Sequence, residues 1–185
     1  MNRLLLFALL LFTSFLTASA KEPVKLAFTN ADVREVIALY QRLTAKKVIY
    51  DNTVQGTVSL SEPAPVGQGK AIELIEKTLF ADGFFLIDAS GDTISIVGLA
   101  RNPRSLGLPT LSKPEAIPAG ERVFTYIFKL RHRAANEVAQ LISAQIAPST
   151  YTSVIPDQKS GTIVVTERTS VIRGLLTLVA NFDVN

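Results

Sequence analysis

The proline-rich segment at residues 99–120 constrains the fold of this chain more than any other feature. It contains four of the nine prolines in the sequence, together with two glycines. Proline lacks an amide donor and glycine loses much backbone entropy on folding, so we expect neither a helix nor a central strand here. Structureless segments longer than about 12–15 residues are uncommon inside one compact domain. We therefore predict two modules, at residues 21–98 and 121–185, joined by a semi-extended linker; a single domain with a long surface loop is the alternative.

The first twenty residues have the pattern of a secretory signal peptide. Arg3 supplies a positive charge, residues 4–16 are an almost unbroken apolar run, and residues 18–20 have the small-x-small pattern of a cleavage site. A run of about 13 residues is too short to cross the roughly 30 Å hydrocarbon core of a bilayer as a helix. We therefore expect a signal peptide at residues 1–20 that is cleaved after Ala20, rather than an uncleaved anchor.

Composition narrows the class of protein. There is no cysteine among the 185 residues, which excludes disulfides, thiolate zinc sites, cysteine nucleophiles and an acylated N-terminal cysteine. An exported chain without disulfides has to rely on packed cores, and this favours a bacterial periplasm over a small secreted scaffold. The net charge of +3 is too small to indicate nucleic-acid binding.

The first module is predicted to alternate short strands with two amphipathic helices. Apolar residues recur at every second position in the strands and at three- and four-residue intervals in the helices. We expect Asn30 to cap the first helix, Tyr40 to pack in the core with its hydroxyl at the rim, and Gly83 to close the second helix in a left-handed conformation. The expected order is β-α-β-β-α-β-β, with strands at 24–28, 47–51, 57–61, 84–88 and 94–96, and helices at 33–43 and 72–79.

The second module is predicted as a three-stranded sheet with two helices, in the order β-α-β-β-α. Its first strand has an aromatic face formed by Phe124, Tyr126 and Phe128, which we assign to the core rather than to the stacking of nucleic-acid bases. Thr169 is expected to cap the last helix. The other elements are expected as a helix at 138–146, strands at 154–155 and 162–166, and a helix at 172–179.

No set of residues in the sequence indicates catalysis. His132 is the only histidine, so a multi-histidine metal site is impossible, and there is no Gly-x-Ser-x-Gly motif. Residues 67–70 (GQGK) lack the spacing and the hydroxyl of a phosphate-binding loop. We expect Asp32, Glu35 and Asp51 to be solvated surface carboxylates. The protein is therefore expected not to be an enzyme and to hold no cofactor and no metal.

Several segments resemble bacterial secretins, the outer-membrane channels of type II secretion, type III secretion and type IV pilus systems. The first module is similar to the outermost periplasmic domain of secretins, which itself resembles the signalling domain of some TonB-dependent receptors. The second module is similar to the ring-forming repeat that follows, which has a KH-like topology. The resemblance is carried by FTNADVREVI at 28–37, VIYD at 48–51, GTVSL at 56–60, AIELI at 71–75, FKLRHRAANEV at 128–138, DQKSGTIVV at 157–165 and LLTLVANFD at 175–183.

The sequence also departs from the secretin pattern. Secretins continue into further repeats and a membrane-embedded β-barrel, whereas this sequence has 185 residues, and it has Ser160-Gly161 where asparagine is usual. We therefore expect either an N-terminal piece of a secretin or a free-standing accessory protein.

The resemblance implies an α+β fold and a non-enzymatic periplasmic module of a secretion or pilus-assembly machine, associated with an outer-membrane secretin complex. Its expected partners are itself or other secretin subunits, inner-membrane components and exported substrate, with no nucleic acid and no membrane span in the mature chain. The alternative is a TonB-receptor-like signalling domain that contacts an anti-sigma regulator. A KH-like nucleic-acid binder is disfavoured, because the second module lacks a Gly-x-x-Gly clamp between its helices.

An inner-membrane partner is expected to add a strand to an exposed sheet edge of the first module. The sequence offers two candidate edges, one at residues 24–28 and one at residues 57–59. Their candidate contact residues are Val24, Lys25, Leu26, Phe28, Thr57, Val58 and Ser59.

Overall fold

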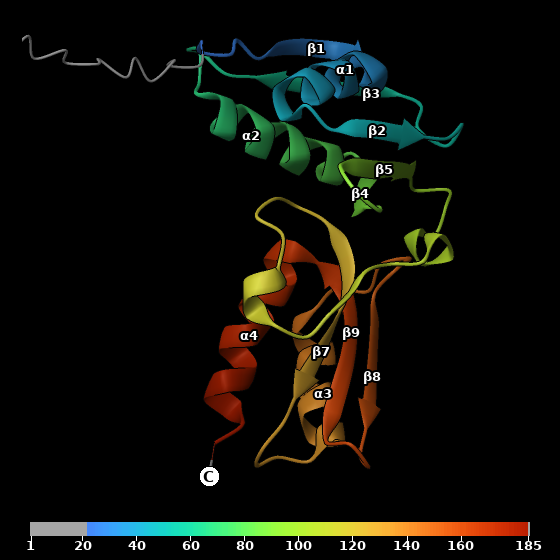
Figure 1. Ribbon diagram of the computed structural model, residues 1–185, viewed down its shortest axis with the longest axis vertical. Coiled ribbons are helices and arrows are strands. Elements are labelled where there is room, and N and C mark those ends of the chain that lie inside the picture. Colours follow the sequence, from blue (N-terminus) through green and yellow to red (C-terminus); the bar gives the residue numbers. More distant parts are fainter. Residues whose placement is uncertain (1–21, 185) are drawn as a thin grey trace, which may run out of the picture.

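The computed structural model describes residues 22–184, which form two modules stacked end to end (Figure 1). The fold class is α+β, as the sequence predicted. The predicted signal peptide, with its cleavage site at Ala20, lies outside the described residues. Every helix within residues 22–184 is too short or too polar to span a bilayer.

The first module has the predicted order of elements. Its strands form two small sheets, one in which β1 and β3 pair antiparallel, and one in which β5 lies between β2 and β4. The apolar stripes of both helices meet in one core with the inward side chains of the strands. The elements are β1 (Ala27–Asp32), α1 (Val33–Thr44), β2 (Lys47–Tyr50), β3 (Thr57–Ser61), α2 (Gln68–Ala81), β4 (Phe84–Asp88) and β5 (Thr93–Gly98).

The start of α1 differs from the prediction. Asn30 does not cap the helix; it lies in β1 with a φ of 50°, and its N–H donates to Ser59 Oγ at 3.0 Å. The N-cap is Asp32, whose Oδ1 accepts the N–H of Arg34 at 2.8 Å. Strand pairing continues to Asp32, so the residue that precedes the first helical turn comes two positions later than predicted. Gly83 does adopt a positive φ, 81°, at the end of α2, as predicted.

The second module contains four strands rather than the predicted three. The sheet order is β6-β7-β9-β8, and helices α3 and α4 cover one face. The aromatic face of Phe124, Tyr126 and Phe128 packs under these helices, which confirms its assignment to the core. The elements are β7 (Val123–Lys129), α3 (Ala135–Gln145), β8 (Ser153–Asp157), β9 (Thr162–Arg168) and α4 (Thr169–Phe182).

The fourth strand comes from the proline-rich linker. Two 3₁₀ turns, Pro103–Leu106 and Pro114–Ala116, flank the two-residue strand β6 (Thr110–Leu111), which runs parallel to β7. The N–H of Thr125 donates to the carbonyl of Pro109 at 2.9 Å. The linker is therefore packed along the second module instead of spanning open space. That each module folds without the other remains a prediction.

The opposite edge of this sheet, at β8, carries a proline. Backbone hydrogen-bonding groups point alternately to the two sides of a strand. The N–H of Thr125 faces β6, so the backbone N–H and carbonyl of the next residue, Tyr126, face β9. When this alternation is followed through the register of β9 and β8, the backbone groups of Val154 and Pro156 point away from β9, toward the outer edge. Pro156 thus interrupts no bond of the sheet, because its missing amide lies on the outer edge.

Candidate interaction surfaces

The two predicted partner-binding segments lie next to each other, because β1 and β3 pair with one another. Ala27 lies opposite Ser61, and Phe28 lies opposite Leu60. Of the predicted contact residues, some point into the core and some point to solvent. Leu26 and Val58 are buried, Val24 and Phe28 are half-buried, and Lys25, Thr57 and Ser59 are exposed.

Because β1 and β3 form a two-stranded sheet, each has an outer edge with no neighbouring strand among residues 22–184, and on the edge of β1 and the segment before it the backbone lies next to exposed side chains. Val24 exchanges two backbone hydrogen bonds with Val66, and the carbonyl of Leu26 accepts the N–H of Glu62 at 3.0 Å. The backbone groups of Lys25 and Ala27 therefore face the other way, toward the outer edge. The structure narrows the predicted edge at 24–28 to these two residues.

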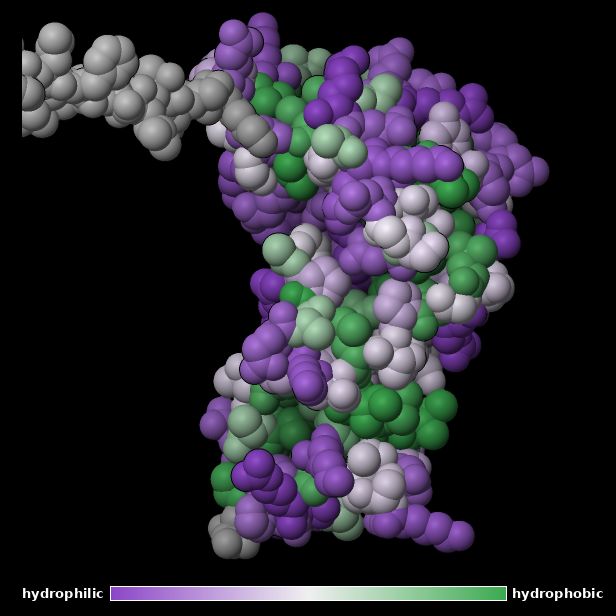
Figure 2. All heavy atoms as spheres, in the orientation of Figure 1, coloured by the Kyte–Doolittle hydropathy of each residue, from purple (hydrophilic) through white to green (hydrophobic). Residues whose placement is uncertain are grey.

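The face of the second sheet that lies opposite the helices carries an apolar row. The register aligns Ile127 of β7, Val164 of β9 and Ile155 of β8 across three neighbouring strands. Ile127 and Val164 are half-buried, and the side chain of Ile155 is 57% exposed. Figure 2 shows hydrophobic residues gathered on the lower module in the region of β8. An apolar row on an otherwise polar sheet face is a candidate docking surface.

A buried polar cluster joins the two modules. Arg122, just before β7, reaches into the first module, where its guanidinium is only 7% exposed. Its Nη1 pairs with Glu76 Oε1 at 2.9 Å and its Nε with Asp88 Oδ1 at 2.9 Å. Its Nη2 donates to the hydroxyl of Tyr40 at 2.9 Å, and that hydroxyl donates to Glu76 Oε1 at 2.7 Å. Every group in the cluster has a partner, as buried polar groups require.

The end of the linker completes this cluster. The N–H of Glu121 donates to Glu76 Oε2 at 2.8 Å, so both carboxylate oxygens of Glu76 have partners. A Cβ atom at Gly120 would overlap the carboxylate of Glu76, and glycine is therefore needed for this approach. The prediction that the hydroxyl of Tyr40 lies at the rim is wrong. The side chain is fully buried, because the second module covers the place where a rim would be.

The charge states of Tyr40 and Arg122 are fixed at neutral pH. Burial raises the pKa of Tyr40 well above 10; Arg122 opposes this rise and Glu76 adds to it. Burial alone would lower the pKa of Arg122, but Glu76, Tyr40 and Asp88 outweigh burial and raise it. Tyr40 is therefore a neutral donor and Arg122 a permanent cation.

A second contact between the modules is aromatic. Tyr151, in the loop between α3 and β8, packs edge to face on Phe85 of β4, with ring centroids 4.9 Å apart. Tyr151 is 4% exposed and belongs to the core of the first module, as does Val123 at the start of β7. Nearby, the side chain of Asn102 donates to the carbonyl of Thr150 at 2.9 Å. The modules therefore share apolar as well as polar contacts.

Tyr151 is expected to make the protein sensitive to alkaline pH. Burial raises the pKa of Tyr151 from 10.0 to about 12. The stability that the folded protein gains from the neutral, buried Tyr151 side chain is therefore complete below pH 10 and is lost as the pH rises toward 12. Two pKa units correspond to about 2 to 3 kcal/mol. Urea denaturation of Tyr151→Phe should therefore show a weaker loss of stability between pH 9 and pH 12 than wild type. Tyr50→Phe, at an exposed position, is the control. An unchanged pH dependence in Tyr151→Phe would contradict this assignment.

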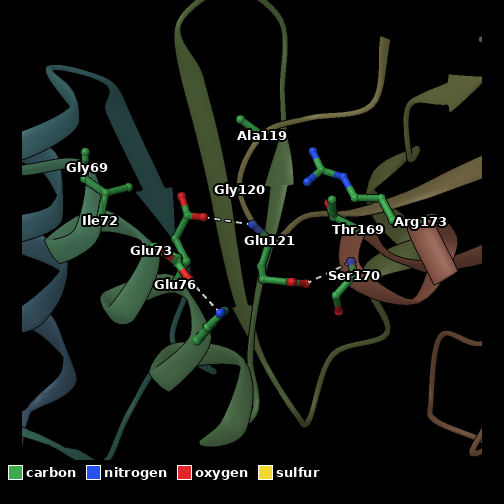
Figure 3. Close-up of a pocket in the computed structure, with 11 residues that line it drawn as sticks. Gly69, Ile72, Glu73, Glu76, Ala119, Gly120, Glu121, Thr169, Ser170 and Arg173 are labelled. Atoms are coloured by element: carbon green, nitrogen blue, oxygen red, sulfur yellow. Dashed lines mark hydrogen bonds and ion pairs between the residues drawn. The ribbon is translucent and has the colours of Figure 1, made fainter. Parts of the chain in front are cut away.

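A cleft of about 630 Å³ lies beside the polar cluster, between the modules. Figure 3 shows α2 on one side, the N-terminus of α4 on the other, and the end of the linker between them. Its charged groups are paired: Lys77 with Glu73 at 2.6 Å, and Arg173 with the carbonyl of Pro118 at 2.7 Å. Within residues 22–184, no three acidic or histidine side chains gather closely enough to hold a metal ion.

The residues that the sequence analysis examined for chemistry have structural roles. Asp51 is not a solvated carboxylate: it is half-buried, accepts the N–H of Thr53 at 2.9 Å and pairs with Arg101 at 2.5 Å. His132 is exposed, and its backbone N–H donates to Asp183 Oδ1 at 2.8 Å. Neither residue takes part in a cluster that resembles an active site.

Arg122, Glu76 and Asp88 were not predicted from the sequence to have a special role. One signal was present in the pattern of α2, where Glu76 occupies the same stripe as Ile72, Ile75 and Leu79. A charged residue at a core-facing helical position indicates a buried partner. The partner itself lies 46 residues further along, beyond the linker, and no local pattern identifies it. Thr169 was also misassigned: Arg168 is the N-cap, and Thr169 Oγ1 instead accepts the N–H of Arg122 at 3.1 Å.

Comparisons with known proteins identify relatives of both modules. Residues 26–96 match the family model of the GspD-like N0 domain. Secretin PulD of Klebsiella pneumoniae is 27% identical over 181 residues, which are 97% of this chain and 26% of the relative. Putative secretin GspD of Escherichia coli (strain K12) is 24% identical over 157 residues, which are 85% of this chain and 24% of the relative. The chain thus spans about a quarter of the length of the curated relatives it matches.

A solved structure shares the fold. It is the outer-membrane complex of the Klebsiella pneumoniae type II secretion system, which contains PulD, PulS and the HR domain of PulC. The match has a TM-score of 0.70 and 23% identity, and it covers 85% of this chain and 26% of the matched chain. The likeness therefore extends over both modules.

Proposed function

We propose that the chain acts as a non-enzymatic interaction module of a type II secretion machine in the periplasm, because residues 26–96 match the family model of the GspD-like N0 domain and the chain is similar to secretins. It associates with further copies or secretin subunits through the second module and receives an inner-membrane partner on the first. The single observation that best supports this is the apolar row on the uncovered face of the second sheet.

A second copy of the chain is the proposed occupant of that apolar row. On α4, Val171 and Leu178 are half-buried against the core of the second module, and the exposed Gly174 lies between them at helical spacing. No atom lies within 4 Å of a Cβ built on Gly174. Glycine inside a helix costs about 1 kcal/mol relative to alanine, and an open, flat position allows a neighbouring chain to approach closely. A sheet face against a helix face is a heterologous interface, which closes into a ring when its rotation permits.

The first module is proposed to dock an extended segment of an inner-membrane component at Lys25 and Ala27. Their backbone groups face the outer edge, and unpaired edge groups accept an added strand. In the related Klebsiella structure, PulD is found together with the HR domain of PulC. We propose a partner of that kind for this chain.

The alternative functions are less well supported. The comparisons match secretins and do not support the TonB-receptor-like signalling domain. The formal net charge of +3 offers little attraction for nucleic acid.

Ile155→Asp tests the proposed self-association. Burying one isoleucine contributes about 1.5–3 kcal/mol, and a carboxylate in the same place adds a desolvation penalty. We therefore expect the dissociation constant for self-association, measured by sedimentation velocity, to rise at least tenfold. Ile49→Asp is the matched control, because Ile49 is similarly exposed, at 51%, on an edge strand of the first module. Unchanged self-association of Ile155→Asp, or equal weakening by both variants, would contradict the proposal.

A further inference from the structure

We propose that the cluster around Arg122 is a latch that sets the angle between the two modules and can open without unfolding either of them. This inference goes beyond the proposed function, since it concerns two modules within one chain and does not depend on whether copies assemble. Four observations support it, and they concern the anchoring of Arg122, the role of the linker, the nature of the interactions and the solvent next to them.

Arg122 is anchored in one module and paired in the other. Its backbone belongs to the second module, where its N–H donates to Thr169 Oγ1 at 3.1 Å and its carbonyl accepts the N–H of Thr169 at 3.0 Å. All three side-chain partners of its guanidinium, Tyr40, Glu76 and Asp88, belong to the first module. One side chain therefore spans the joint and determines how the modules meet.

The linker closes the same joint. Its last residues place the N–H of Glu121 on Glu76 Oε2, and Gly120 lies directly against that carboxylate. The linker thus approaches α2 at the residue that Arg122 also binds. A movement of the linker and a movement of Arg122 are coupled through Glu76.

The interactions of the joint favour a defined geometry more than a permanent association. A buried ion pair loses hydration on closing, so its net contribution to stability is small even when its geometry is good. The apolar contacts that cross the joint are few, with Tyr151 and Val123 the residues of the second module in the core of the first. An apolar interface of the same size would hold the modules together without fixing their angle.

The latch borders solvent-accessible space. Asp88 is 33% exposed on its side chain, and the cleft of about 630 Å³ borders Glu76 and Glu121. When the modules separate, the carboxylates and the guanidinium enter solvent directly, which offsets the loss of their mutual attraction. The two core clusters lie on either side of the joint and are otherwise separate. Opening therefore withdraws Tyr151 and Val123 from the first core and leaves the remaining residues of each core together.

The absence of cysteine from the sequence makes the angle measurable. Ala38→Cys on α1 and Gln140→Cys on α3, both at exposed helical positions, would carry spin labels. Pulsed electron–electron double resonance then measures the distance between the two labels. Wild type is expected to give one narrow distance distribution. The double variant Arg122→Met/Glu76→Gln removes both buried charges, and circular dichroism establishes whether it is folded. We expect a folded protein with a clearly broadened distribution.

Gly120→Ala tests the latch without changing any charge. Its methyl group would displace the carboxylate of Glu76, so the distribution should again broaden while the circular dichroism spectrum stays the same. Gly174→Ala, where the added methyl meets open space, is the matched control and should keep the narrow distribution. A narrow distribution in folded Arg122→Met/Glu76→Gln or in Gly120→Ala would overturn the proposal. Loss of the folded spectrum in both variants would also overturn it, because the cluster would then be part of the folding core.

Discussion

Replacing Tyr40 by alanine is expected to lower the free energy of unfolding of the first module by about 3–5 kcal/mol, the usual cost of removing a fully buried aromatic ring. Tyr40 has no exposed surface and lies on the buried stripe of α1. Its ring packs in the apolar core, and its hydroxyl donates to Glu76 and accepts from Arg122. Alanine removes both contributions, and urea denaturation followed by circular dichroism measures the loss.

Tyr40→Phe separates the hydroxyl from the ring. It keeps the apolar packing and removes one partner from each of Glu76 and Arg122, which costs about 1–3 kcal/mol for buried groups. A hydroxyl at a solvated rim would instead make this change nearly neutral. A neutral Tyr40→Phe would therefore contradict the buried cluster, whatever the effect of Tyr40→Ala.

Replacing Leu26 by proline is expected to destabilise the first module by more than about 3 kcal/mol. Leu26 is fully buried, and its backbone faces β3, where its carbonyl accepts the N–H of Glu62. Proline removes apolar volume from the core and places its ring on the paired side of the chain, next to the bond that the Leu26 carbonyl accepts from Glu62. Thermal denaturation should show a melting temperature lower by roughly 6 °C or more, at about 2–4 °C per kcal/mol.

Ala27→Pro is the matched control for this prediction. Ala27 is the next residue, but it is exposed and its amide faces the outer edge. We expect a much smaller loss of stability, combined with loss of the proposed strand addition when an HR domain of the PulC type is titrated in a calorimeter. Equal destabilisation by the two prolines would show that the assigned hydrogen-bonding directions are wrong.

The sequence predicted the elements that depend on local patterns. The helical spacing over residues 33–43 and the left-handed Gly83 are short-range features, and both are found in the structure. The first strand was predicted at 24–28 but lies at Ala27–Asp32, because its pairing with β3 continues up to the start of α1. The N-cap of α1 was predicted at Asn30 and is Asp32, because both residue types are good caps and the length of strand pairing decides between them.

The joint could not be predicted from local patterns. Arg122 lies 82 residues from Tyr40 and 34 from Asp88, and an arginine or an aspartate alone is typical of a solvated surface. The pairing of β6 with β7 was missed for a similar reason. Proline is unfavourable in central strands but acceptable beside a short edge strand, and only the folded chain shows that Thr110 and Leu111 reach that edge.

The position of Pro156 affects how the edges of this sheet can pair between copies of the chain. A sheet with a long open edge can serve as a template on which further chains stack into fibres. Here the linker strand occupies part of one edge, and on the other edge Pro156 interrupts the row of outward-facing amides, of which Val154 keeps one. In the proposed self-association, copies would therefore meet through their faces, because neither edge of this sheet offers an uninterrupted row of backbone groups.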